Sequence, residues 1–317
     1  MIDQPIEVSR RARTEKVIAL VDLAGRLAAL GNNGCSVCIG GLFKQGRPTA
    51  LVRELIRSGL SDLKLFSSPG SGYDVDLLVA SGIVSEAFLP AVTLENRFCP
   101  SFRSAVERGA IKAHVVDALT IIGGLLAAAH NVPYQPVTGW AGSDVLKFNP
   151  LIKPVESPFG SERVWAVPAI RPDFVLLHAQ EGDVYGNACH LSTMTYADEL
   201  MVRAGKKVFV SVDKLIPHEA ILRDPRATTV PGIYVEAIVE APFGAHPSAS
   251  YPNYGMDEVF IEQFADLGDY VRKTGDARPI ADYIHKYVRD PKDIFDYIDA
   301  VGGYRKIFSL EREARFI

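Results

Sequence analysis

The residues best placed to do chemistry are the glycines of Gly40-Gly-Leu-Phe-Lys-Gln-Gly46, which follow a short apolar run. Gly40, Gly41 and Gly46 would let the backbone approach a ligand closely, and free amides at the start of the next helix would favour anionic oxygen. Gly41 and Gly46 have the spacing of a phosphate-binding loop, but Arg47-Pro48 stands where Lys and Ser or Thr are required. We therefore predict either a ligand-facing turn or a tight strand-to-helix turn without a ligand.

A second glycine-rich turn, Ser68-Pro-Gly-Ser-Gly-Tyr73, follows the next apolar run. If both runs are parallel strands, the two turns lie at the same carboxyl edge of the sheet, where open α/β sheets bind ligands. Gly70 and Gly72 therefore join the candidate binding residues.

Glu95 and His246 are the candidates for acid–base or pocket-lining roles. Glu95 follows a third apolar run and falls on the same predicted edge, although pairing with Arg97 or Arg103 is the simpler interpretation. His246 lies in Ala-Pro-Phe-Gly-Ala-His-Pro-Ser, just after another apolar run, and we rank a structural anchor ahead of acid–base chemistry. The other histidines are scattered without ligand spacing and read as surface or core residues, so we expect no metal site.

Composition and charge narrow the class of protein. Lys and Arg number 34 against 38 for Asp and Glu, a net charge of −4, which argues against nucleic acid as a main partner. Cys35 and Cys38 form a C-x-x-C inside an apolar run, with no second pair, and read as small buried hydrophobes. The polar residues 1–16 and the absence of a run long enough to cross a bilayer predict a cytoplasmic protein without a membrane contact.

Apolar runs of four to six residues alternate with helical patterns through the first part of the chain. The predicted strands are 36–40, 63–66, 83–88 and 111–116, and the predicted helices are 14–30, 48–58, 73–81, 100–109 and 118–130. This alternation indicates an open, mainly parallel α/β sheet with helices on both faces.

The remainder divides into an irregular middle, further strands and a helical tail. Residues 131–162 are rich in Pro, Gly and Ser, which favours a functional loop or a partner-contacting segment. Further strands are expected at 164–169, 173–178, 207–212 and 233–239, with a helix at 195–204. The amphipathic tail 256–317 is assigned to packing, and residues 1–317 to a single domain.

The segment from Asn33 to Pro48 resembles the first signature of the class I coenzyme A transferases. In that signature an Asx-Gly pair precedes an apolar strand, followed by Gly-Gly-Phe, three residues, Gly, any residue and Pro. This chain departs at Cys38, normally aliphatic, and at Leu42, normally Phe. The similarity extends over nearly the whole chain, including 178–187, 231–248 and 251–255, and is greatest to the alpha subunit of glutaconate CoA-transferase.

This resemblance implies that the chain provides half of an active site. A beta subunit of the same fold would carry the catalytic glutamate in a Ser-Glu-Asn-Gly motif, which is absent here; Leu94-Glu-Asn-Arg97 lacks the glycine. That glutamate would take CoA from an acyl-CoA thioester and pass it to a second carboxylic acid. The alpha chain would shape the acyl pocket through its glycine turns, with CoA thioester as substrate and no permanently bound cofactor.

Two alternatives remain open. The chain also resembles the alpha subunit of the ring-opening acyl-CoA hydrolases of steroid degradation, whose beta chain lacks the glutamate. Their alpha-chain carboxylate falls near Asp117-Ala118, where alanine replaces it; Asp117 itself reads as a helix cap. That departure favours the transferase. The third alternative is a non-catalytic subunit that binds CoA esters.

Overall fold

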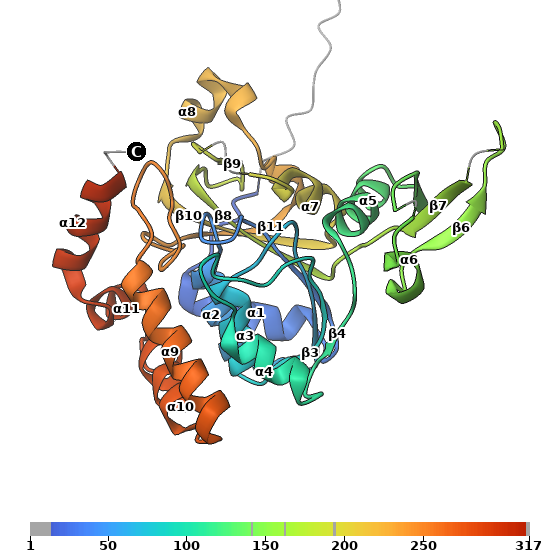
Figure 1. Ribbon diagram of the computed structural model, residues 1–317. Coiled ribbons are helices and arrows are strands. Elements are labelled where there is room, and N and C mark those ends of the chain that lie inside the picture. The colour runs from blue at the N-terminus through green and yellow to red at the C-terminus, as the bar shows by residue number, and fades with distance from the viewer. Residues whose placement is uncertain (1–13, 141, 162, 193–194, 315–317) are drawn as a thin grey trace, which may run out of the picture.

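A computed structural model describes residues 14–140, 142–161, 163–192 and 195–314. Within these residues the central sheet has the order β11-β10-β8-β1-β2-β3-β4, and a short β9 pairs antiparallel with β8 (Figure 1). All other pairings in this sheet are parallel, as predicted. The strands are β1 (Ser36–Ile39), β2 (Leu63–Phe66), β3 (Val84–Phe88), β4 (Lys112–Ala113), β8 (Phe174–Gly182), β9 (Ala188–Cys189), β10 (Lys207–Leu215) and β11 (Val235–Glu240).

Helices cover both faces of this sheet because its strands are apolar on both sides. Val37 and Ile39 of β1 point into one hydrophobic core, whereas Cys38 between them points into another. The first core is closed by α1 (Leu20–Leu30), α2 (Thr49–Arg57), α3 (Tyr73–Ala80) and α4 (Pro100–Glu107), and the second by α5 (Ala118–Ala129) and α7 (Asp198–Ala204). The predicted two-sided α/β sheet is confirmed.

Several predicted boundaries are wrong by a few residues. Helix α1 begins at Leu20 rather than at residue 14, because the preceding residues run beside β11: the Ile18 amide donates to Ile238 and the Ile238 amide to Lys16. Strand β8 extends to Gly182, and β4 contains only two residues of the predicted 111–116. Strand β11 starts at 235 because a 3₁₀ turn, η2 (Gly232–Tyr234), precedes it.

The prediction that residues 131–162 are irregular is wrong. They contain β5 (Tyr134–Val137), a short α6 (Val145–Phe148) and β6 (Lys153–Glu156), and with β7 (Arg163–Pro168) they form an antiparallel sheet in the order β5-β7-β6. We call residues 134–168 the finger, because it projects from the body of the molecule (Figure 1). Prolines in the two outer strands hid the strand pattern, since edge strands tolerate the missing amide.

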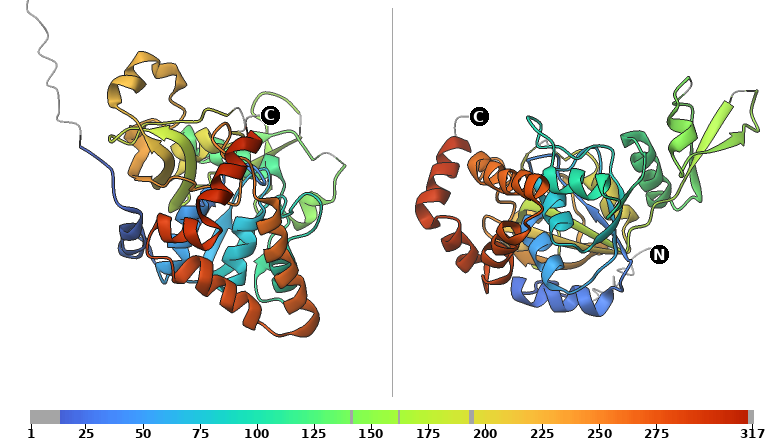
Figure 2. Two further views of the ribbon diagram at one scale, coloured as in Figure 1. Left: turned by 90° about the vertical axis from the view of Figure 1, so that its left-hand side faces the viewer. Right: turned by 60° about the horizontal axis from the view of Figure 1, so that its bottom comes forward.

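The tail is helical, as predicted, and packs on the first core. It comprises α9 (Glu258–Thr274), α10 (Arg278–Ile284), the π-helical turn η3 (His285–Arg289), α11 (Ile294–Ala300) and α12 (Gly303–Ala314). Phe260, Phe264 and Tyr297 of this region are buried with the side chains of α2 to α4 (Figure 2). A helix α8 (His218–Arg223) and a 3₁₀ turn η1 (Pro225–Ala227) lie between β10 and β11.

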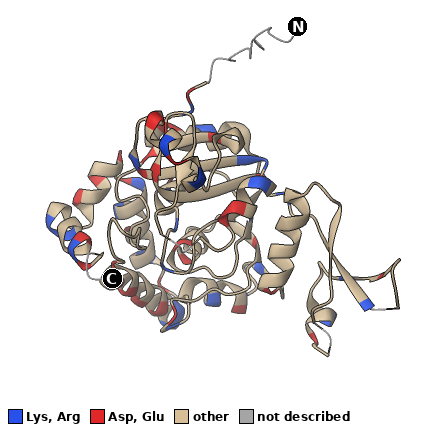
Figure 3. Ribbon diagram, turned by 90° about the horizontal axis from the view of Figure 1, so that it is seen from above, with Lys and Arg blue, Asp and Glu red and all other residues tan. Residues whose placement is uncertain are grey.

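Charged residues of both signs are interspersed along the chain when the molecule is viewed from above (Figure 3). None of the helices in the described ranges is both long and apolar enough to span a membrane.

Candidate functional site

The strand order reverses at the centre of the sheet, where β1 lies between β8 and β2. Loops that leave the carboxyl ends of strands on either side of such a point diverge, and the space between them is where open α/β sheets bind ligands. The loops after β1 and β2 meet here, since the Phe43 amide donates to the Gly70 carbonyl at 3.3 Å. The loop after β3 joins them through Ser71, which exchanges backbone hydrogen bonds with Ala91 and Thr93.

The two glycine turns pack too closely to admit side chains. Gly41 has φ +82°, and a Cβ on it would lie 2.5 Å from the Gly46 carbonyl oxygen. A Cβ on Gly70 would lie 2.0 Å from the Phe43 ring, which covers the second turn. Phe43 has φ +49° and Glu95 has φ +68°, and such left-handed backbone in non-glycine residues is concentrated at functional sites.

The expectation of free amides in these turns is wrong. Four of the candidate glycines already donate to acceptors within the chain. The bonds are Gly40 to the Leu176 carbonyl (3.0 Å), Gly41 to Asp198 Oδ1 (3.0 Å), Gly46 to the Ala249 carbonyl (2.8 Å) and Gly72 to Asp74 Oδ1 (3.3 Å). Two hydroxyls in the second turn, on Ser68 and Ser71, are instead buried without a hydrogen-bond partner among the described residues. They are the donors that this turn retains for a ligand oxygen.

Arg47, which excludes a phosphate-binding loop at the sequence level, joins the two turns. Its side chain is fully buried, and Nη2 lies 2.5 Å from the carboxylate of Asp74, also buried. Nη1 donates to the Gly41 carbonyl at 3.0 Å and to the Gly70 carbonyl at 3.3 Å. One guanidinium therefore contacts the first turn, the second turn and the helix that follows it.

Glu95 lies at the predicted edge but not with the predicted partners. Its side chain is 56% exposed and lies 3.7 Å from Nζ of Lys44, which also pairs with Glu258. Because Lys44 belongs to the first glycine turn, Glu95 stands at the rim of the candidate site. Arg103 pairs instead with Glu107 on its own helix.

Arg97 is taken up by the tail. It bonds three carboxylates of α9, those of Glu262, Asp266 and Asp269, at 2.5–2.7 Å. Hydrogen bonds to Asp266 and its neighbours raise the pKa of Arg97 above its usual value. The loop that carries Glu95 is thus fastened to α9.

His246 lies in the protein interior rather than at the rim. Its Nε2 lies 3.1 Å from Oδ2 of Asp257, its Nδ1 lies 2.7 Å from the Tyr297 hydroxyl, and its ring stacks on Phe243. Burial lowers the pKa of His246 to about 4. Burial raises the pKa of Asp257, but hydrogen bonds from His246 and Lys306 outweigh it and bring the pKa to about 2. This geometry supports the anchoring interpretation, because His246 links the loop after β11 to the tail.

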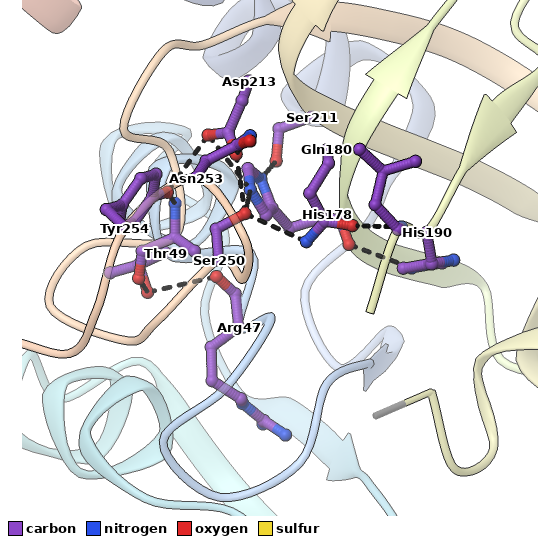
Figure 4. A network of polar contacts seen from close by, with 12 residues as sticks. Arg47, Thr49, His178, Gln180, His190, Ser211, Asp213, Ser250, Asn253 and Tyr254 are labelled. Atoms are coloured by element: carbon purple, nitrogen blue, oxygen red, sulfur yellow. Dashed lines mark hydrogen bonds and ion pairs between the residues drawn. The ribbon is translucent and has the colours of Figure 1, made fainter. Parts of the chain in front are cut away.

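A buried polar network around His178 was not predicted (Figure 4). Its Nδ1 lies 2.9 Å from the Ser211 hydroxyl and its Nε2 lies 3.3 Å from Asp213. Ser250 donates to Asp213 at 2.6 Å and accepts from Gln180 at 3.0 Å. Burial opposes ionisation of Asp213, yet the nearby His178 lowers its pKa. The sequence gives no local signal for this network, since its members come from three separate segments.

A second histidine connects this network to the first glycine turn. Nε2 of His190 lies 3.0 Å from the His178 carbonyl and 3.5 Å from Asp198, whose other oxygen holds the Gly41 amide. Burial lowers the pKa of His190. A small cavity at the point of strand reversal is lined by Gln45 and Gln180 together with His190 and Asp198.

The C-x-x-C pair has the predicted structural character. Cys35 and Cys38 are buried and free, and burial raises the pKa of both thiols. Within the described residues no group of three or more His, Cys, Asp or Glu side chains is arranged to hold a metal ion.

The fold and the paired glycine turns agree with comparisons to known proteins. Residues 22–241 match the family model described as coenzyme A transferase. The chain therefore belongs to the coenzyme A transferase family.

The similar chains are alpha-type subunits of that family. The chain is 33% identical over 262 residues to the cholesterol ring-cleaving hydrolase IpdA subunit of Mycobacterium tuberculosis, covering 80% of this chain and 88% of the other. It is 29% identical over 311 residues to the alpha-type subunit of glutaconate CoA-transferase from Acidaminococcus fermentans, covering 92% and 93%. The crystal structure of glutaconate CoA-transferase from the same organism superposes with a TM-score of 0.83 at 26% identity, covering 93% and 95%.

Proposed function

We propose that this chain is the alpha subunit of a heteromeric CoA-transferase that moves CoA between an acyl-CoA thioester and a carboxylic acid. The glutamate that attacks the thioester carbonyl comes from a beta subunit; an acyl–oxygen bond forms, the carbon–sulfur bond breaks and CoA thiolate leaves. The thiolate then attacks the glutamyl carbonyl of the anhydride, which gives a glutamyl-CoA thioester and releases the first acid. A second carboxylate reverses these steps and collects the CoA, so no permanently bound cofactor is required.

The engagement of the carboxylates at the carboxyl edge carries this proposal. Asp74 bonds Arg47, Asp198 bonds the Gly41 amide, and Asp213 bonds Ser250. Each is buried and already paired, and the exposed Glu95 lies beside Lys44. A nucleophile supplied by a partner fits this edge, while the alpha chain contributes the turns that shape the acyl pocket and exclude water, which would hydrolyse the anhydride.

The second candidate is an acyl-CoA hydrolase subunit, favoured by the 33% identity to the cholesterol ring-cleaving hydrolase subunit. Asp117 is the carboxylate nearest to the position that this activity implies. In the structure Asp117 caps α5 by accepting from the Thr120 amide, and it also accepts from the indole of Trp140. These bonds leave Asp117 committed to the helix start, which favours the transferase.

The test is to purify the tagged chain from its native cell and incubate what co-purifies with acyl-CoA thioesters. We expect a stoichiometric partner of the same fold whose intact mass rises by that of CoA minus water, because its glutamate becomes a thioester. Replacing that glutamate by Gln in the partner should abolish both the mass increase and CoA exchange.

Other outcomes separate the alternatives. A partner without the glutamate, together with acyl-CoA consumed and no CoA passed to a carboxylate, would support the hydrolase. A chain that binds CoA esters but recovers no partner and shows no turnover would contradict both enzymes and leave the binding subunit.

A further inference from the structure

The ion pair between Arg47 and Asp74 is completely buried, which demands an explanation beyond stability. Both side chains are inaccessible to solvent, and their closest nitrogen and oxygen atoms lie 2.5 Å apart. Burying such a pair removes two charges from water, and well-packed apolar residues of similar volume often stabilise a protein equally well or better. The pair is therefore better explained by what it holds in place.

What it holds is the relative position of the two glycine turns. Nη1 of Arg47 bonds the carbonyls of Gly41 and Gly70, whereas Nη2 bonds Asp74 at the start of α3. The opposite side of Gly41 is fixed as well, because its amide donates to Asp198. A planar guanidinium presents its donors in a fixed fork, so it can set the separation of two backbone carbonyls as a lysine cannot.

We propose that Arg47 is a positioning residue for the CoA transfer suggested above, and that Asp74 orients it. The guanidinium sets the distance between the two turns that form the acyl pocket, and the turns move as one unit because they share it. This inference rests on the proposed function only for the reaction that it serves. The coupling of the two turns is a separate, measurable property of the chain.

The test is a paired replacement in the complex of this chain with its native partner. Arg47→Met and Asp74→Leu are made singly and together. Each single variant should melt at a lower temperature, because it leaves an unpaired buried charge, and the double variant should recover most of that loss. We expect kcat of the double variant to stay about 100-fold below wild type, as for a misplaced reacting group, with a much smaller change in KM. Arg47→Lys should recover the charge but only part of kcat.

A matched control comes from another ion pair on the same helix. Arg57 and Glu54 pair at the far end of α2, roughly 12 Å along the helix from Thr49. The double variant Arg57→Met/Glu54→Leu should alter the melting temperature and leave kcat unchanged. If the Arg47/Asp74 double variant recovers both stability and kcat, the pair is only structural and the proposal is overturned.

Hydrogen exchange separates this proposal from the proposed function. In the Arg47→Met/Asp74→Leu variant, amides in 40–48 and 67–73 should exchange at least about tenfold faster, while amides of the β8–β10 pair should not change. If the wild-type complex shows no CoA transfer, the proposed function fails, yet faster exchange in both turns would still uphold their coupling. Unchanged exchange in either turn would overturn it.

Discussion

Single buried side chains at the carboxyl edge bind the backbone of loops that are distant in sequence. Arg47 holds two turns, Asp198 holds the amide of Gly41 across 157 residues, and Thr49 donates to the Ala245 carbonyl across 196 residues. A buried backbone group that loses its partner destabilises the fold by about 1–3 kcal/mol. The geometry of the candidate site therefore depends on individual side chains that do not themselves touch a substrate.

His246 leads to a prediction about pH. The unfolded chain binds a proton at the usual imidazole pKa of 6.5, whereas the folded chain does so only near pH 4. The unfolded state thus carries more protons between these values, and stability falls as the pH falls through them. In His246→Gln, the slope of unfolding free energy against pH between 4 and 6.5 should be smaller by about 1.4 kcal/mol per pH unit.

Urea unfolding at a series of pH values measures this slope. The exposed His130 offers the matched control, and His130→Gln should keep the wild-type slope. An identical slope in His246→Gln and wild type would contradict the buried neutral imidazole. If His246 is only an anchor, kcat/KM of the folded variant should stay within about a factor of two of wild type.

At the scale of elements, α5 shows how a candidate carboxylate can be a local structural device. Asp117 accepts from the Thr120 amide and hydroxyl, which satisfies a donor that the first turn of a helix leaves unpaired. It also accepts from Trp140 at the base of the finger, so the same side chain connects the helix start to the neighbouring element.

Substitutions at Asp117 distinguish the cap from a catalytic role. Asp117→Ala should lower the free energy of unfolding by about 1 kcal/mol, whereas Asp117→Asn should change it by less than about 0.5 kcal/mol because asparagine caps as well. Both changes are read from chemical denaturation. With stability retained, Asp117→Asn should also keep kcat/KM; a loss of 100-fold or more would assign chemistry to Asp117 and favour the hydrolase.

At the scale of the whole molecule, three parts are joined around one sheet. The tail shares the first core with α1 to α4, and it fastens the loops after β3 and β11 through Arg97 and His246. The finger leaves the opposite side of the body (Figure 1), and the buried Val167 in β7 marks its packed base. Phe159, at 97% exposure, lies between β6 and β7.

The two tryptophans test whether these parts form one domain. Trp140 and Trp165 both belong to the finger, so tryptophan fluorescence reports on the finger whereas far-ultraviolet circular dichroism reports on the whole chain. We expect the two thermal transitions to coincide, because the base of the finger packs on α5, itself part of the second core. Trp165→Phe assigns the signal to each tryptophan. Fluorescence that changes well before circular dichroism would show that the finger unfolds separately and would contradict a single domain over 1–317.

The accuracy of the sequence predictions follows the range of the interactions involved. The strands around β1 and the helices after them were predicted because apolar periodicity is local. The finger was missed because its prolines suppress the strand pattern, and the start of α1 was misplaced because residues 16–18 pair with β11, more than 200 residues away. The partner of Glu95 was wrong for the same reason: Lys44 becomes its neighbour only when two loops meet at the sheet edge.

The sequence by itself determined the family, the two-sided α/β sheet and the adjacency of the two glycine turns, because motifs, periodicity and parallel strand order are written along the chain. Only the tertiary structure decided that the glycine amides are occupied, that Arg47 joins the turns and that His246 is an anchor. Those outcomes depend on which donors and acceptors meet across the folded sheet. Burial then makes each meeting count, since a polar group removed from water must find its partner in the protein.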